Sequence, residues 1–176
     1  GSEDGTWVKI FDLNLSTESK NRVYRVNDYE FVFRNLNEEE AGTISNSRFE
    51  DSKVSNKHRN IDGVQPLKMI LRNRKDKQNQ MTIKITGEKS IVLGSSNRAD
   101  YQLEGDKIAD FHFEIRLVNG SFLLRNLNHN ISESYGVYKR LFPDENYVIR
   151  PGHGIRIGDL EFHVERFNTG IVSEKG

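Results

Sequence analysis

The feature that most constrains the fold is an alternation of apolar and polar residues, which dominates the chain from Pro66 onward. It is clearest at 81–86, 111–117 and 160–165, where every second side chain is apolar. This period of two is typical of β-strands with one buried face, whereas an amphipathic helix repeats about every 3.6 residues. No segment between 67 and 167 has a convincing helical pattern. We therefore predict an all-β structure for this region.

Turn-forming residues separate the alternating runs, most clearly at Asn119 and Gly120. Both central residues of a type I′ turn need positive φ, which Asn and Gly tolerate, so this pair predicts a β-hairpin. Short strands joined by tight turns at this spacing are typical of a sandwich or barrel. The predicted core consists of the inward-facing members of the runs, namely Met81, Ile83, Phe113, Ile115, Leu124, Ile157 and Phe162.

The sequence before Pro66 divides into two parts of different character. Residues 1–36 contain three further predicted strands rich in aromatic side chains, at 7–11, 22–26 and 29–33. So short a segment cannot form a stable core alone, so we expect an N-terminal β-strand appendage that packs on the rest of the chain or on a second chain. Residues 37–66 are too polar to bury and predict a linker or mobile loop. The main domain then spans 67–167, with a C-terminal tail at 168–176.

Composition and spacing argue against several classes of function. The chain has no Cys, which removes disulfides and cysteine-ligated metals, and its five His residues show no metal-binding spacing. We therefore expect no metal site, no cofactor and no catalytic residues. Lys and Arg number 26, as do Asp and Glu, so there is no net charge to attract nucleic acid or membrane. No segment approaches the roughly 20 apolar residues of a membrane-spanning helix, and we expect an intracellular protein, cytoplasmic or nuclear.

The main domain carries a recognisable series of motifs. A strand ends at Gly94, Asp100 begins the next short strand, and Ala109 to Ile115 combines a loop, a His and an alternating strand. A further strand follows at 120–127, and 151–162 has the pattern of a closing hairpin. In spacing and order, residues 67–167 resemble the forkhead-associated (FHA) domain family. The resemblance implies an FHA-like β-sandwich of the SMAD/FHA type, here with additional N-terminal strands.

The resemblance also implies a function. FHA domains are non-catalytic protein–protein interaction modules, typically within larger signalling proteins, and they bind phosphothreonine peptides through end loops. An Arg and a Ser of the family hold the phosphate, and an Asn holds the peptide backbone. The matching positions of this chain are Ser95, Ala109 and Tyr135. Because no hydroxyl replaces a bidentate guanidinium, we expect phosphothreonine recognition to be weak or absent.

Other residues offer an alternative pocket. Arg98 and Lys107 lie in the first two of these loops, and basic side chains at the shared end of a sandwich are able to hold a phosphate. The competing interpretation is a set of solvated loop charges. Asn128 and the polar residues after it either bond a peptide backbone or serve turn chemistry. The candidate ligand-binding residues are Gly94, Ser95, Ser96, Arg98, Lys107, Ala109, His112, Ser134, Tyr135, Gly136, Lys139 and Arg140. Of these, the resemblance implies that His112 braces the loops by bonding to neighbouring backbone.

A weaker internal similarity links the two ends of the chain. The segments 5–9, 24–26 and 30–34 line up in order with 136–139, 147–149 and 161–165. This similarity predicts that residues 1–36 are the closing half of a preceding FHA-like unit, and chance is the alternative.

Three hypotheses about function follow. The first is an interaction module for a protein or phosphoprotein. The second is a pseudo-FHA domain for phosphate-independent scaffolding or self-association through the N-terminal strands. An enzyme is the third and least favoured.

Overall fold

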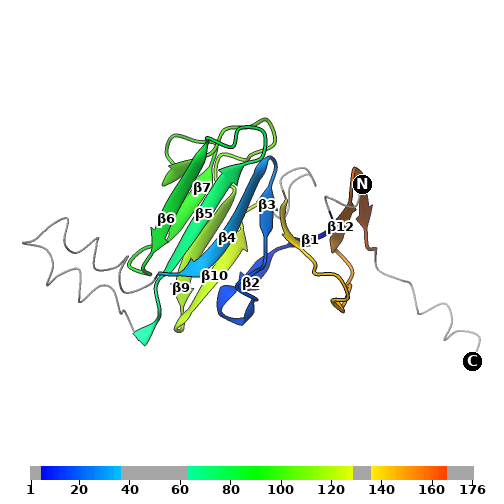
Figure 1. Cartoon of the computed structure of the whole chain (residues 1–176), viewed down its shortest axis with the longest axis horizontal. Coiled ribbons are helices and arrows are strands. Elements are labelled where there is room, and N and C mark those ends of the chain that lie inside the picture. The colour runs from blue at the N-terminus through cyan, green and yellow to red at the C-terminus, as the bar shows by residue number, and fades with distance from the viewer. Residues whose placement is uncertain (1–4, 37–62, 129–135, 166–176) are drawn as a thin grey trace, which may run out of the picture.

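The computed structural model describes residues 5–36, 63–128 and 136–165, which form two packed β-sheets (Figure 1). The larger sheet contains, in spatial order, β13 (Leu160–His163), β12 (Gly154–Ile157), β1 (Thr6–Ile10), β11 (Val137–Arg140), β3 (Tyr24–Val26), β4 (Tyr29–Asn35), β5 (Leu67–Asn73) and β6 (Gln80–Ile85). The smaller sheet contains β2 (Asp12–Asn14), β10 (Ser121–Asn126), β9 (Phe113–Val118), β7 (Ile91–Gly94) and β8 (Tyr101–Gln102). A short 3-10 helix, η2 (Leu15–Thr17), follows β2. The predicted all-β sandwich is confirmed.

The N-terminal strands are interior members of the larger sheet. β1 lies between β11 and β12, and the β3–β4 hairpin lies between β11 and β5. β2, which is only three residues long and was not predicted, forms an edge of the smaller sheet beside β10. Strands from both sides of the polar segment therefore alternate within one sheet. We propose that they fold as one unit rather than as an appendage and a domain.

The core lies between the two sheets. Phe31 of β4 and Phe113 of β9 stack at its centre, with ring centroids 5.2 Å apart and an interplanar angle of 6°. Such offset aromatic pairs contribute stability beyond the apolar area they bury. Four predicted core residues are buried as expected, and they are Ile83, Phe113, Ile115 and Leu124. Met81 packs against the core but is only partly buried.

The prediction for two other core residues is wrong, because Ile157 and Phe162 are 49% and 50% exposed. Their alternation was read correctly, since the strand register puts them on the same side of the larger sheet as Phe31. The larger sheet, however, has eight strands and the smaller only five. β12 and β13 extend beyond the smaller sheet, so the side that would face the core is uncovered (Figure 1). Period two identifies an apolar face without revealing whether a second sheet lies opposite.

The polar segment begins and ends at adjacent points of the larger sheet. β4 and β5 are antiparallel neighbours, with Asn35 opposite Leu67. The Leu36 amide donates to the Pro66 carbonyl over 2.9 Å, which fastens the two ends together. Of the segment predicted as a linker, residues 37–62 lie outside the described residues, as does the predicted tail at 168–176.

The predicted hairpin at Asn119 and Gly120 is confirmed. Their φ angles are 49° and 81°, and Val118 of β9 pairs with Ser121 of β10 across the turn. Both central residues thus have the positive φ that a type I′ turn requires.

Candidate functional site

Two loops of the predicted site meet at one end of the smaller sheet. The Ser95 amide donates to the Ala109 carbonyl over 2.9 Å, and the Ser96 amide donates to the Asp110 carbonyl over 3.2 Å. The contact is so close that a Cβ on Gly94 would lie 2.0 Å from the Asp110 carbonyl oxygen. Only glycine fits there, so Gly94 sets the distance between the loop after β7 and the loop before β9.

His112 braces these loops from inside, as the family resemblance implied. The side chain is fully buried, and its Nδ1 accepts a hydrogen bond from the Ala109 amide over 3.0 Å. Since Nδ1 is then an acceptor, Nε2 carries the proton and donates to the Gly136 carbonyl 3.2 Å away. One imidazole thereby joins the loop before β9 to the start of β11.

The side chain that contacts the Ser95 hydroxyl is a carboxylate and not a cation. The Ser95 hydroxyl, at the position of the family's Arg, donates to Asp110 Oδ1 over 3.3 Å. Gln102 donates its side-chain amide to the Ser95 carbonyl over 2.9 Å and holds the same loop from the other side. Asp110 was not among the predicted site residues. Its place directly after Ala109 was the available signal.

The two basic candidates of the loops remain at the rim. Arg98 and Lys107 are exposed, and the Arg98 amide donates to the Ser96 hydroxyl over 3.0 Å in a local turn. The side chain of Ala109, at the position of the family's Ser, has no hydroxyl to offer a phosphate. Ser134 and Tyr135 lie outside the described residues, so the third loop is represented by Gly136.

Asn128 has an internal role. It is 8% exposed, and its side-chain amide donates to the carbonyls of Phe111 and His112 over 2.7 and 3.1 Å. The turn-chemistry interpretation therefore fits this residue, since its donors already bond to the loop before β9. The candidate role of holding a peptide backbone does not fit.

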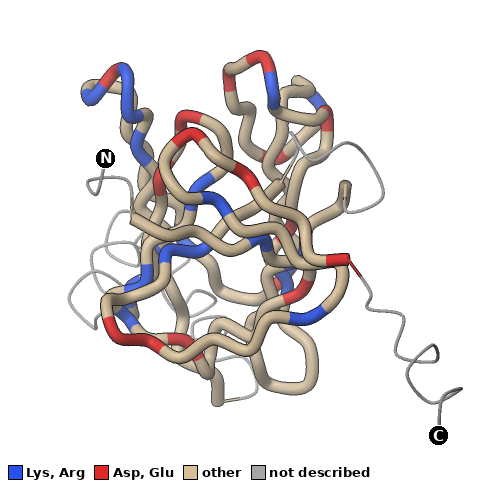
Figure 2. The backbone as a smooth tube through the Cα atoms, turned by 90° about the vertical axis from the view of Figure 1, so that its right-hand side faces the viewer, with Lys and Arg blue, Asp and Glu red and all other residues tan. Residues whose placement is uncertain are grey.

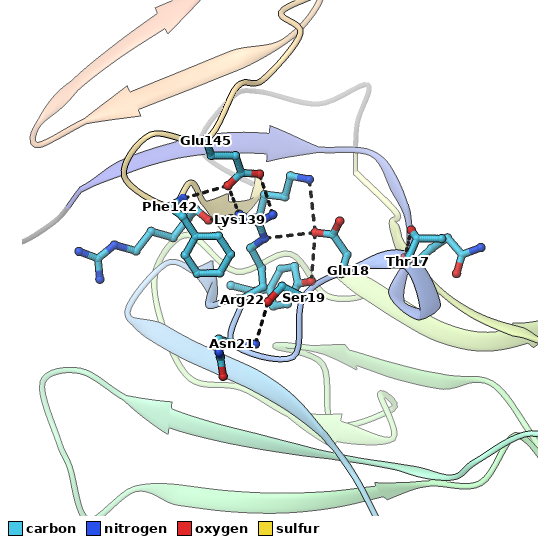
Figure 3. Close-up of polar contacts among 11 residues, drawn as sticks. Thr17, Glu18, Ser19, Asn21, Arg22, Lys139, Phe142 and Glu145 are labelled. Carbon is cyan, nitrogen blue, oxygen red and sulfur yellow. Dashed lines mark hydrogen bonds and ion pairs between the residues drawn. The ribbon is translucent and has the colours of Figure 1, made fainter.

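The structure does not bring Lys139 and Arg140 to the loops. Arg140 lies at the far end of β11, opposite Trp7 of β1. Lys139, the neighbour of Arg140 along β11, is 7% exposed and lies on the opposite face of the sheet from Arg140, within a network of charged residues (Figure 3). Its Nζ donates to Glu18 over 3.3 Å and lies over the Tyr147 ring. Lys139 therefore stabilises the fold and does not line the candidate pocket.

The same network joins the N-terminal segment to the connection between β11 and β12. Arg22 donates to both oxygens of Glu145, over 2.5 and 2.7 Å, and also lies 3.4 Å from Glu18 (Figure 3). Its guanidinium rests 4.5 Å above the Phe142 ring. The hydrogen bonds from Arg22 lower the pKa of Glu145 to about 2. This is a structural ion-pair network; its Glu18 and Arg22 border one surface cavity, and its Phe142 and Glu145 border another.

Two further observations bear on chemistry. In the described part of the chain, no three His, Asp or Glu side chains are grouped so that they could hold a metal ion. None of the residues in 5–36, 63–128 and 136–165 belongs to a helix that is long and apolar enough to cross a membrane.

Comparison with known proteins gives one finding. The family model of the FHA domain matches residues 91–158, which run from β7 to the turn after β12. No curated protein and no solved structure matches the chain.

Proposed function

Because the chain contains an FHA domain, which is a protein-interaction module, we propose that it binds a protein partner through its end loops without depending on phosphothreonine. The chain acts by binding and not by catalysis, as the recognition or scaffolding part of a larger signalling protein. The observation that carries this proposal is the contact between Ser95 and Asp110.

The argument is one of charge. A phosphate brings nearly two negative charges, and a site that binds it needs a cation or several N–H donors. At the clamp position this chain has a neutral hydroxyl already bonded to the Asp110 carboxylate. Replacing the charged clamp and its two neutral partners removes about 3 to 6 kcal/mol of phosphate-dependent affinity, a factor of about 10² to 10⁴. A partner with hydroxyl or amide groups suits the remaining loop better than an anion does.

A phosphothreonine peptide library tests the proposal. We expect the unmodified chain to bind no member in the micromolar range, and the variant Ser95→Arg/Ala109→Ser/Tyr135→Asn to gain phosphate-dependent binding to some member. Micromolar, phosphate-dependent binding by the unmodified chain would contradict the proposal. Arg98→Ala and Lys107→Ala would then identify the residues responsible.

Phosphate-independent self-association is the second candidate. It was expected to use the N-terminal strands, but β1, β3 and β4 each have a strand hydrogen-bonded on both edges. Among the four N-terminal strands of the described structure, β2 is the one that lies at a sheet edge. Self-association through N-terminal strands is therefore confined to β2, a three-residue edge, and we rank it below binding through the loops. An enzyme is still the third hypothesis, and a screen for turnover distinguishes it from both.

A further inference from the structure

The chain contains the same β-hairpin twice. Residues 24–34 of β3–β4 align without gaps with residues 155–165 of β12–β13. Four positions are identical, and they are Arg25 with Arg156, Asp28 with Asp159, Glu30 with Glu161 and Phe31 with Phe162. This alignment differs from the sequence-based one, because the counterpart of 24–26 is 155–157 and not 147–149.

The turns and pairing of the two hairpins also correspond. Asn27 and Gly158 begin the turns with φ angles of 51° and 59°, a conformation that few residue types adopt readily. The pairing Val26 with Tyr29 in the first hairpin repeats as Ile157 with Leu160 in the second. Each hairpin therefore has the same register on its two strands.

The charged contacts repeat as well. Arg25 pairs with Glu30 at 2.8 Å, and Arg156 pairs with Glu161 at 3.4 Å. Each guanidinium also covers an aromatic ring, Arg25 over Trp7 at 4.0 Å and Arg156 over Tyr138 at 4.7 Å. Backbone, ion pair and cation–π contact agree, which chance similarity of short β patterns does not explain.

The two hairpins are related by an approximate two-fold axis between β1 and β11. These central strands are antiparallel, β3 pairs with β11, and β12 pairs with β1. Arg25 lies opposite Tyr138, and Arg156 lies opposite Trp7. The strands β13–β12–β1–β11–β3–β4 thus form two nearly symmetric repeats, β1 with β3–β4 and β11 with β12–β13. The hairpin of each repeat pairs with the central strand of the other, β3 with β11 and β12 with β1.

The surroundings of the two hairpins are not symmetric. β4 pairs with β5 along seven residues, and its Phe31 is 1% exposed against the smaller sheet. Across the described residues, β13 has no strand on its outer edge. The apolar side of the β12–β13 hairpin is formed by Ile157, Leu160 and Phe162, which are 49%, 63% and 50% exposed. Figure 1 shows this hairpin standing beyond the smaller sheet.

We propose that β12–β13 is the docking surface for a second body of the kind formed by residues 67–127. Its occupant is a polypeptide with an edge strand antiparallel to β13 and an apolar sheet that covers Ile157, Leu160 and Phe162. Glu30 lies opposite Arg72 of β5, so the symmetric position opposite Glu161 calls for a basic residue. Figure 2 shows Lys and Arg interspersed with Asp and Glu along the backbone on this side of the molecule, so no single sign of charge marks it. Apart from the Glu161 pair, we therefore base the recognition on the exposed apolar side chains.

A second copy of this chain does not supply the missing body. In every copy, β5 is paired with β4 on one edge and β6 on the other, and Phe113 is already covered by Phe31. The residues that the structure describes therefore hold two closing hairpins and a single body. The occupant is a separate polypeptide segment that repeats the pattern of 67–127.

A peptide of residues 66–86, which contains β5 and β6, serves as the probe. It is titrated to millimolar concentration onto the full chain while amide hydrogen exchange is followed by NMR. We expect exchange in β13 to slow at least about tenfold as the edge strand is paired, with no change at β6 or β2. Phe162→Glu removes this protection, whereas Phe111→Glu, at a 39% exposed Phe in the loop before β9, keeps it.

A charge exchange provides a test that does not depend on the apolar side. Glu161→Lys weakens binding of the peptide about tenfold, and a peptide with Arg72→Glu restores it. Unchanged exchange in β13, or equal protection at β6 and β2, would overturn the proposal. So would a chain that is dimeric without peptide and becomes monomeric with Phe162→Glu, because the occupant would then be a second copy.

Discussion

Arg22 and Glu145, which are 123 positions apart in the sequence, are joined by two hydrogen bonds. Arg22 precedes β3, and Glu145 lies in the connection between β11 and β12. The pair therefore ties the N-terminal strands to the second repeat at a point where no strand pairing does so. Arg22 is 7% exposed and Glu145 is 22% exposed, so water screens the pair only partly.

This pair predicts a loss of stability in acid. The pKa of Glu145 is lowered from 4.5 to about 2 in the folded protein. Its contribution is fully present above pH 4.5 and is lost as the pH falls towards 2, because the unfolded chain takes up the proton first. Glu145→Gln should cost about 2 kcal/mol at pH 7 and flatten the decline below pH 4.5. Urea unfolding across this pH range measures both effects.

Asp144→Asn is the matched control. Asp144 is the exposed neighbour of Glu145 and has a φ of 65°, which Asn also tolerates. We expect unfolding to change by less than about 0.5 kcal/mol. If Asp144→Asn altered the acid limb as much as Glu145→Gln does, general charge and not the Arg22 pair would be responsible.

The duplicated hairpin allows a second prediction with an internal comparison. Phe31 and Phe162 occupy equivalent positions, but Phe31 is 1% exposed and Phe162 is 50% exposed. Phe31→Ala should cost about 3 to 5 kcal/mol, and Phe162→Ala should cost less than about 1 kcal/mol. Chemical denaturation of both variants decides this. Equal costs would show that Phe162 is buried in solution.

These two phenylalanines also show what could be predicted from the sequence. Both alternate with polar neighbours, so both were correctly placed on apolar strand faces. Local pattern contains nothing about the number of strands in the opposite sheet, so the exposure of Phe162 was missed. The place of β1 and β3 within the larger sheet was missed for a related reason, because strand order depends on contacts between distant segments.

His112 predicts that the loops lose order together. His112→Ala leaves the Ala109 amide and the Gly136 carbonyl without their partner and opens a cavity in a fully buried place. We expect a loss of about 2 to 4 kcal/mol. NMR should also show broadened signals in both loops at the β7–β9 end. His163→Ala, on the exposed part of β13, is the control, and loops that stay ordered in His112→Ala would refute the bracing role.

The candidate site was predictable in outline and not in its charge. The family spacing correctly brought Ser95 and Ala109 to adjacent loops, and it identified His112 as the brace. It placed Lys139 with the loops, whereas the strand geometry turns that side chain to the ion-pair network. Asp110 was missed because its role depends on a hydrogen bond between two loops, which spacing along the chain does not encode.

Asp110 leads to the last prediction, which concerns the variant Ser95→Arg/Ala109→Ser/Tyr135→Asn. An Arg at position 95 would lie beside the Asp110 carboxylate, which bonds Ser95 in the unmodified chain. The new ion pair competes with a phosphate for the guanidinium, so adding Asp110→Asn should strengthen binding to phosphothreonine peptides about five- to tenfold. Fluorescence anisotropy with phosphorylated and unphosphorylated forms of one library peptide measures the change. Asp106→Asn, an exposed acid of the same loop, controls for net charge and should have less than about a twofold effect. Equal effects of the two substitutions would show that long-range charge, and not the contact with position 95, limits phosphate binding.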